Sequence, residues 1–244
     1  MLSMPSESAT EPKRAADSAT ARSRIRRAVS EADKSARRAA ILTAADTQFR
    51  AAGFEKFSME VLSRELEVAR GTLYRYFSTR EELLLNLYQR RQRQFVDALI
   101  NATRVGIGDE DFLRLWYDLS LADPTLIALR LRLTNVIEHN VEQEVLVATK
   151  QAMSEDFNRL CAHLSGVLRL PQPQTDQLVV ALLALLLGAA QADAAPEIDT
   201  SALPAETLRI MNCFASESVF LSNAELILSG LRQQRGRGQP TGLE

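Results

Sequence analysis

Apolar residues recur at helical spacing in the stretch Val68-Ala69-Arg70-Gly71-Thr72-Leu73-Tyr74-Arg75-Tyr76-Phe77. Val68, Leu73 and Phe77 fall on one side of a helix, where they can pack into a core. The residues between them are mostly small, polar or basic, which suits a surface that faces outward. We therefore expect a short helix over roughly 69–76 that is held by one face only.

The residues that precede this stretch predict a longer first helix. The pattern becomes helical at Lys34, and Ile41, Ala45 and Phe49 follow four residues apart. Gly53 comes next, at a position where helices often end on a left-handed residue, a backbone that glycine adopts without strain. The first helix is thus expected to end close to Gly53.

Short capping signals mark the next helix starts. Ser58 can cap a second helix, and Phe57 before it can form a hydrophobic staple with Leu62 after it. Ser78 and Glu81 fit the S-x-x-E capping box, which predicts a long fourth helix that begins there. Two short helices that follow a longer one are the parts of a helix-turn-helix.

A helix-turn-helix reads duplex DNA when the outer side of its second short helix enters the major groove. Such a helix needs small and polar side chains toward the bases, and hydroxyls or cations toward the flanking phosphates. Arg70, Thr72 and Tyr74 fall on the outward side of the predicted helix. On these grounds we interpret residues 34–84 as a DNA-binding domain.

The charge distribution favours contact between the first half of the chain and a polyanion. Residues 1–105 contain 19 Lys and Arg against 13 Asp and Glu, whereas residues 106–244 contain 10 against 18. Residues 1–33 have no apolar period, and we interpret them as a mobile tail. Arg22, Arg24, Arg26 and Arg27 leave two interpretations open, a solubilising tail or a basic arm that binds DNA.

The remainder of the chain has the composition and periodicity of helices, so we predict an all-α fold of about nine helices. Leu and Ala are abundant, and no segment alternates as a strand does. Further helices are expected at about 109–121, 124–138, 141–169, 174–192 and 203–230, within a second helical domain over residues 85–232. Residues 233–244 are predicted to be a disordered tail.

The sequence offers no motif for an enzyme, a metal site or a cofactor. Cys161 and Cys213 form no metal-binding spacing with His139 and His163, and we expect two buried thiols in a reducing cytoplasm. Neither a Gly-rich phosphate loop nor a nucleophile motif is found. The N-terminus lacks an apolar signal-peptide core, and the strongest apolar run, 13 residues over 178–190, is short for a bilayer. A soluble cytoplasmic protein is the expectation.

The N-terminal pattern resembles the TetR family of bacterial transcriptional repressors. The resemblance covers about residues 36–84, and its most specific part is Gly71-Thr72-Leu73-Tyr74 with Tyr76-Phe77. Two positions depart from the family pattern. Glu67 stands where the family usually has Gly in the turn, although Gly adopts turn backbone more easily. Ala69 stands where the family often has a capping Ser or Thr.

The resemblance implies a homodimer that binds a palindromic operator and is released from it by a small molecule. It implies that Arg70 reads a base edge, that Gly71 permits close approach, and that Thr72 touches a thymine methyl or a phosphate. The DNA-binding residues expected from it are Arg70, Gly71, Thr72, Tyr74, Arg75, Tyr76, Arg80, Arg37 and Arg38.

The layout of the family also implies where subunits pair and where an effector binds. The last two long helices would pair with their copies, and the first of them is apolar nearly all round, so it must be covered on every side. The effector would lie among the helices at 109–169, in a largely apolar pocket that favours a hydrophobic or amphipathic molecule. The expected interface residues are Leu178, Leu182, Leu185, Leu186, Ala189, Phe214 and Phe220. The expected pocket residues are Phe112, Trp116, Tyr117, Leu133, Asn135, His139, Met153 and Phe157.

Other functions remain compatible with parts of this pattern. The same DNA-binding fold would serve an activator or a regulator that needs no ligand. An enzyme, or a membrane-associated scaffold that uses the apolar helix, is less favoured because its motifs are missing and the apolar run is short.

Overall fold

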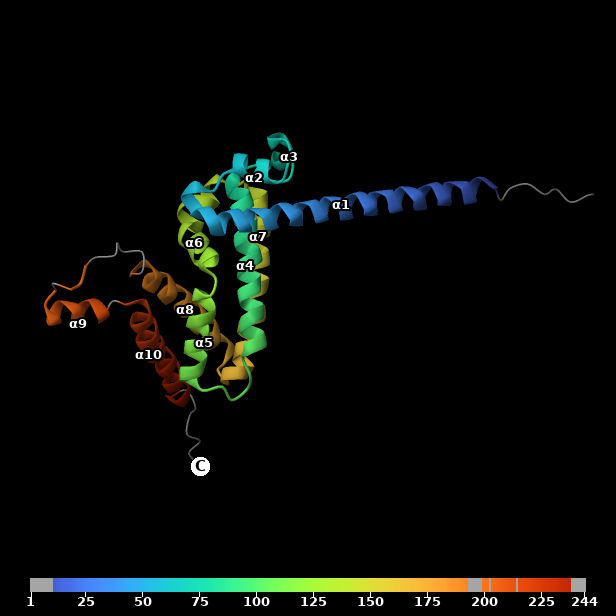
Figure 1. The fold of residues 1–244 in the computed structure, drawn as a ribbon. Helices are drawn as coiled ribbons and strands as arrows, with labels where there is room; N and C mark the ends of the chain where they lie inside the picture. Colours follow the sequence, from blue (N-terminus) through green and yellow to red (C-terminus); the bar gives the residue numbers. More distant parts are fainter. Residues whose placement is uncertain (1–10, 193–198, 202, 214, 238–244) are drawn as a thin grey trace, which may run out of the picture.

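A computed structural model describes residues 11–192, 199–201, 203–213 and 215–237, and side chains of residues 31–191 and of most of residues 199–234. Within these residues every regular element is a helix, which confirms the predicted all-α class (Figure 1). The elements are α1 (Glu11–Lys56), α2 (Met59–Glu65), α3 (Arg70–Tyr74), α4 (Arg80–Ala102), α5 (Asp109–Leu121), α6 (Pro124–Arg132), η1 (Leu133–Ile137), η2 (Glu138–Asn140), α7 (Gln143–Leu168), α8 (Gln172–Ala192), α9 (Ala205–Cys213) and α10 (Ser216–Arg237).

The first helix is much longer than expected. It begins at Glu11, so residues 11–33 are helical where the sequence analysis expects a mobile tail. Ala, Arg and Glu in this segment are good helix formers, and Figure 1 shows α1 extending well beyond the body of the molecule. Gly53 has the positive φ that was predicted for it, 72°, but its ψ of 179° is extended and not left-handed helical. The residue kinks α1, and helical residues continue to Lys56. Residues 1–10, and the side chains of the arginines at 22–27, lie outside the described residues.

The first part of the chain folds around one apolar cluster. Ile41 and Phe49 from α1, Leu62 from α2 and Leu73 from α3 are all buried, together with Phe77. Ser58 caps α2 as predicted, because its Oγ accepts a hydrogen bond from the amide of Glu60 at 3.2 Å. The two short helices α2 and α3 are therefore fixed on the longer α1 in the helix-turn-helix arrangement.

The long helix α4 starts one residue later than its capping box predicts. Thr79, not Ser78, is the N-cap, and its Oγ1 accepts from the amide of Glu82 at 2.9 Å. The carboxylate of Glu82 in turn accepts from the amide of Ser78 at 2.7 Å. The reciprocal pair thus shifts by one residue because Glu82, not Glu81, is the buried acid on the side of the helix that faces the domain.

In the second part of the chain, α5, α6 and α7 pack against α4. Helices α8 and α10 pack against each other on the far side of α5 and α7, and α9 lies at the outside next to α10 (Figure 1). Two predicted helices are divided. The segment expected at 124–138 is an α-helix only to Arg132, and continues as a π-helical turn over Leu133–Ile137 and a 3-10 turn over Glu138–Asn140. The segment expected at 203–230 forms α9 and α10 as separate helices, and α10 continues to Arg237, so residues 233–237 are helical where a tail was predicted. Residues 238–244 lie outside the described part of the chain.

Helix α8 carries the most apolar sequence of the chain. It is longer than the 13-residue run that marked it, and residues 172–191 are long and apolar enough to cross a membrane on length and composition alone. The helix nevertheless packs against α10 inside the domain, with Leu178, Leu182 and Leu186 buried. Core helices of water-soluble proteins have the same composition. These contacts account for the apolar residues on the inner side of α8, whereas Val180 on its outer side is exposed.

Candidate nucleic-acid interface

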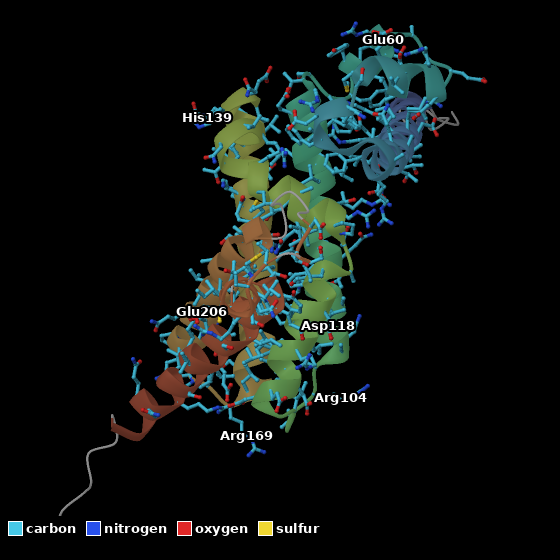
Figure 2. All side chains as sticks on the ribbon, turned by 60° about the vertical axis from the view of Figure 1, so that its left-hand side comes forward. Glu60, Arg104, Asp118, His139, Arg169 and Glu206 are labelled. Atoms are coloured by element: carbon cyan, nitrogen blue, oxygen red, sulfur yellow. The ribbon has the colours of Figure 1, made fainter. Side chains whose placement is uncertain are left out.

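Helix α3 is held on its inner side and open on its outer side. Leu73 is fully buried, and Phe77 after the helix is buried with it. On the other side Arg70, Gly71 and Tyr74 are exposed. Figure 2 places this part of the molecule, with the labelled Glu60 of α2, at one end of the elongated body. The geometry therefore presents a short helix whose outer side chains are free to meet a partner.

The outer face of α3 is ordered by a contact between its two largest side chains. A guanidinium nitrogen of Arg70 lies 3.4 Å from the hydroxyl of Tyr74, one turn later, and the guanidinium lies 5.7 Å from the centre of the tyrosine ring. The hydrogen bond with Tyr74 raises the pKa of Arg70. Arg70 is thus a permanent, exposed cation on the face that a helix-turn-helix turns toward DNA.

The other expected DNA-binding residues divide into exposed and anchored groups. Arg37 and Arg75 are exposed, and Thr72 and Tyr76 are half-buried at the edge of the same surface. Arg38 instead donates to the carbonyl of Tyr76 at 2.6 Å and to Asn86 Oδ1 at 2.9 Å. Its guanidinium also lies 4.2 Å from the centre of the Phe77 ring. Arg38 therefore fixes the end of α3 against α1, and most of its donors are used within the domain.

Arg80 points into the protein and not toward a phosphate. Its guanidinium donates to the carbonyls of Phe54 and Phe57 and pairs with Glu81 at 3.2 Å. It also lies 4.6 Å from the centre of the Phe54 ring. The sequence analysis expects Arg80 to bind DNA, but these donors are used within the protein. A sequence pattern does not show that the carbonyls of Phe54 and Phe57, at and just after the end of α1, lie within reach of this side chain. Arg80 joins the start of α4 to the end of α1.

The turn that leads into α3 carries both departures noted in the sequence. Glu67 has a φ of 53°, so a residue with a Cβ occupies the left-handed backbone that Gly adopts more easily. The turn is closed by a hydrogen bond from the amide of Val68 to the carbonyl of Ser63 at 3.0 Å. Ala69 is the N-cap of α3 and supplies no side-chain hydrogen bond. The start of α3 is thus strained at one residue and uncapped at another.

We expect Glu67→Gly to raise the free energy of unfolding by about 1 kcal/mol, because it removes the steric cost of a left-handed side chain. Urea denaturation of the full chain measures the change. Glu65→Gly is the matched control, since Glu65 lies in ordinary helical backbone two residues earlier and should lose about 0.5–1 kcal/mol. Equal losses for both variants would show that the turn is not strained at Glu67.

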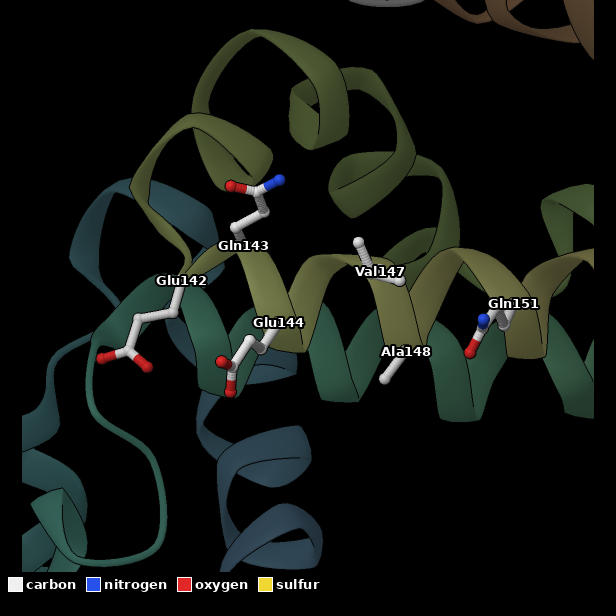
Figure 3. A pocket seen from close by; sticks show the side chains of 6 residues that line it. All are labelled: Glu142, Gln143, Glu144, Val147, Ala148 and Gln151. Atoms are coloured by element: carbon white, nitrogen blue, oxygen red, sulfur yellow. The ribbon is translucent and has the colours of Figure 1, made fainter.

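The residues expected to line an effector pocket are mainly core residues of the second domain. Phe112, Trp116, Tyr117 and Leu133 are buried, and Met153 and Phe157 are half-buried against the same core, whereas Asn135 and His139 are exposed around η1 and η2. A surface hollow of about 710 Å³ opens over the start of α7, and none of the eight residues lines it (Figure 3). It is bordered by Glu142, Gln143, Glu144, Val147, Ala148 and Gln151. This hollow is open to solvent and most of the residues that border it are polar or charged, unlike an enclosed pocket for an apolar molecule.

Most of the residues expected at a dimer interface are buried within a single chain. Leu178, Leu182, Leu186, Ala189 and Phe220 are at most 1% exposed within a single chain, so they pack into their own subunit. Leu185 is half-buried against the same core, and Phe214 lies outside the described residues. The sequence shows that α8 is apolar on all sides but not which side faces α10 of the same chain. The outward sides of these helices are described below.

The two thiols have different surroundings. Cys161 is buried, and burial raises its pKa to about 12, so it is a core residue and no nucleophile. Cys213, at the end of α9, is exposed, which corrects the expectation of two buried thiols. Among the residues that the structure describes, no group of three His, Cys, Asp or Glu side chains could hold a metal ion.

An exposed second helix on a helix-turn-helix, followed by a long helical domain, defines a class of DNA-binding transcription regulators. Residues 41–87 match the family model of bacterial regulatory proteins of the tetR family. Residues 89–235 match the model of the tetracyclin repressor-like C-terminal domain. The two matches together cover most of the chain and meet within α4. The chain belongs to the TetR family of bacterial regulatory proteins.

Solved structures show the same fold. One is a TetR variant from Acinetobacter baumannii AYE in complex with minocycline, with a TM-score of 0.52 at 13% identity over 84% of this chain and 98% of that one. Another is the TetR family transcriptional regulator PfmR from Thermus thermophilus, with a TM-score of 0.46 at 20% identity over 78% and 98%. A search of curated proteins found no match. The likeness to the Acinetobacter structure, at 13% identity, supports the fold only.

Proposed function

We propose that this protein is a transcriptional repressor of the bacterial cytoplasm, which binds a palindromic operator as a homodimer and leaves it when a small amphipathic effector binds. One observation carries the proposal. The outer face of α3 exposes Arg70, Gly71 and Tyr74, and the two larger side chains form a hydrogen bond with each other. A helix of this shape and charge fits the major groove.

The geometry supports different roles for the residues on this face. Arg70 is placed to donate to a guanine edge. Gly71, which has nothing within 4 Å of the place of a Cβ, keeps the approach to the groove open. Thr72, Tyr74, Arg75 and Tyr76 surround these two and can bind bases or phosphates, and Arg37 adds a cation on α1. Arg38 and Arg80 are left out of the proposed contacts because their donors are used internally.

We expect Arg70→Ala to weaken operator binding by roughly 5- to 150-fold, the effect of losing a bidentate contact of about 1–3 kcal/mol. Binding-site selection on genomic fragments supplies the operator, and fluorescence anisotropy then compares it with a scrambled duplex. The loss should be larger on the operator than on the scrambled duplex, because a base contact carries sequence preference.

Arg104→Ala is the control for this measurement. Arg104 is an exposed arginine at the opposite end of the body from α2 and α3 (Figure 2). Its loss removes the same charge without touching the proposed interface, so both duplexes should bind as before. Equal weakening of both duplexes by Arg70→Ala would assign this residue to phosphates and not to bases.

Dimerisation is proposed through the outward faces of α8 and α10. Two apolar side chains on these helices are strongly exposed, Val180 at 56% and Leu226 at 71%. Ala184 and Gly188 are also exposed on α8, and such small residues permit close approach of a second helix. A two-fold dimer presents two copies of α3, which matches the symmetry of a palindrome.

Release is proposed to pass along α4. This helix begins beside α3 and runs through the second domain (Figure 1), where it packs against α5, α6 and α7. An effector that favours a different arrangement of these helices would depopulate the dimer conformation in which the two α3 helices fit two half-sites. The test is displacement of operator DNA by small molecules. If no compound from a broad panel changes operator affinity, the ligand-controlled part of the proposal is wrong.

A further inference from the structure

The core of the second domain contains a buried cation without a counter-charge. Arg130, on α6, is 8% exposed, and no carboxylate among the described residues forms an ion pair with it. Its guanidinium donates to Gln92 Oε1, and its Nη1 is buried without a partner. Buried charges are usually paired, because removing a charge from water is costly. An unpaired buried guanidinium therefore indicates a missing anion.

A second unsatisfied donor lies against the same aromatic ring. Trp116, on α5, is fully buried, and its Nε1 has no hydrogen-bond partner. Its ring centre lies 5.5 Å from that of Phe95, and the guanidinium of Arg130 lies 5.8 Å from the centre of the same Phe95 ring. Buried tryptophan N–H groups usually find an acceptor. Two donors from different helices thus lack an acceptor around one phenylalanine of α4.

The surroundings of these donors do not supply the missing acceptor. Gln92 Oε1 already accepts from Arg130, and the hydroxyl of Tyr88 also donates to it at 3.4 Å. The next ring in the cluster is Phe112, whose centre lies 6.0 Å from that of Trp116. The site is therefore largely aromatic. Its polar groups are the Gln92 amide and the Tyr88 hydroxyl, which bind each other, and two donors without an acceptor, one of them cationic.

We infer that the effector is an amphipathic anion, a carboxylate on a hydrocarbon body, whose oxygens accept hydrogen bonds from Arg130 Nη1 and Trp116 Nε1. This inference rests on the proposed ligand control and names the chemical class of the ligand. The hydrocarbon body would pack among the aromatic side chains, and the carboxylate would neutralise the guanidinium. Because these side chains are buried, the ligand must move α5 or α6 relative to α4. The proposed release of DNA also requires the helices packed on α4 to move.

The only tryptophan of the chain reports on the site directly. The full chain is titrated at neutral pH with two matched pairs, decanoate with decanol and 4-butylbenzoate with 4-butylbenzyl alcohol, while Trp116 emission and operator binding are both followed. We expect at least one carboxylate to change the emission, to release the operator and to bind about 10- to 100-fold more tightly than its alcohol, as a charge-assisted hydrogen bond predicts.

Arg130→Gln should abolish this preference, so that the carboxylate binds no better than the alcohol. It should also leave the melting temperature unchanged or raise it, because it removes an uncompensated buried charge. Arg132→Gln is the control, since Arg132 lies on the same helix, is half-exposed and pairs with Glu55 at 3.2 Å. It should preserve the preference for the carboxylate.

The outcomes separate this inference from the proposed function. If the alcohols bind as tightly as the carboxylates and release the operator, the inference that the effector is an anion is wrong. The proposal that a ligand controls the repressor would then still stand. A marked fall in the melting temperature of Arg130→Gln would make Arg130 a structural residue and also overturn the inference. Failure of all four compounds to change the Trp116 emission would overturn it as well, whereas failure of the unliganded protein to bind any operator would contradict the proposed function itself.

Discussion

Replacing Arg91 with Ala is expected to lower the free energy of unfolding by about 3 kcal/mol, as breaking a buried ion pair does. Arg91, on α4, is buried and binds Asp46 of α1 through two nitrogens, one of them at 3.0 Å. A third nitrogen lies 3.4 Å from Asp123, the N-cap of α6. Burial by itself would lower the pKa of Arg91. The hydrogen bond to Asp46 and the charges of Asp123 and Asp46 have the larger combined effect, so the net pKa is raised. Its loss leaves both carboxylates without their shared partner.

Arg90→Ala is the matched control for this loss. Arg90 is the neighbouring residue of α4, and it donates a hydrogen bond at 3.1 Å to the exposed hydroxyl of Thr43. Surface contacts of this kind contribute little, so its free energy of unfolding should change by less than about 0.5 kcal/mol. Guanidinium denaturation measures both variants. If Arg91→Ala and Arg90→Ala are equally stable, the triad of Arg91, Asp46 and Asp123 does not hold the two domains together.

Replacing Leu226 with Glu is expected to convert the proposed dimer into monomers and to weaken operator binding by about 10²- to 10⁴-fold. Leu226 is the most exposed apolar side chain on α10, and a carboxylate there would be buried without a partner in a dimer. A monomer binds one half-site only, so it loses the affinity that a dimer gains when its second DNA-binding domain binds at high effective concentration. Light scattering after size exclusion gives the oligomeric state, and anisotropy gives the operator affinity.

Val105→Glu is the control for the interface. Val105 is 65% exposed and lies in the loop between α4 and α5, outside the helices of the proposed interface. The substitution adds the same charge at an exposed valine, so dimers and operator binding should both persist. Dimers that survive Leu226→Glu at micromolar concentration would place the subunit contact elsewhere.

Much of the DNA-binding domain could be predicted because its signals are local. The apolar spacing of Val68, Leu73 and Phe77 identifies α3 and its inner face, and Ser58 marks the start of α2. Glu67 was recognised as a residue in a turn that suits glycine, and its φ of 53° is the left-handed value that such a turn requires. Each of these features depends on residues within one or two helical turns, which a sequence displays directly.

The regulatory half could be predicted only as a set of helices. Its sequence shows apolar surfaces, but the partner of each surface lies far away in the chain. Leu178 and Phe220 were expected at a subunit contact, and the tertiary structure instead packs α8 and α10 against each other within one chain. Trp116 is expected to line an effector pocket, and the structure buries it in the core. Nothing in the sequence pattern shows that its Nε1 lacks an acceptor.

The sequence by itself determined the helical class, the helix-turn-helix and the outward face of α3, because these follow from spacing along one element. Only the tertiary structure decided that Arg38 and Arg80 turn inward, that Arg91 joins α1 to α6, and that Arg130 is buried without a counter-charge. A long side chain such as arginine has many rotamers of similar energy. Its hydrogen-bond partner therefore depends on which carbonyls and carboxylates the fold brings within reach. The residues next to it in the sequence do not indicate which these are.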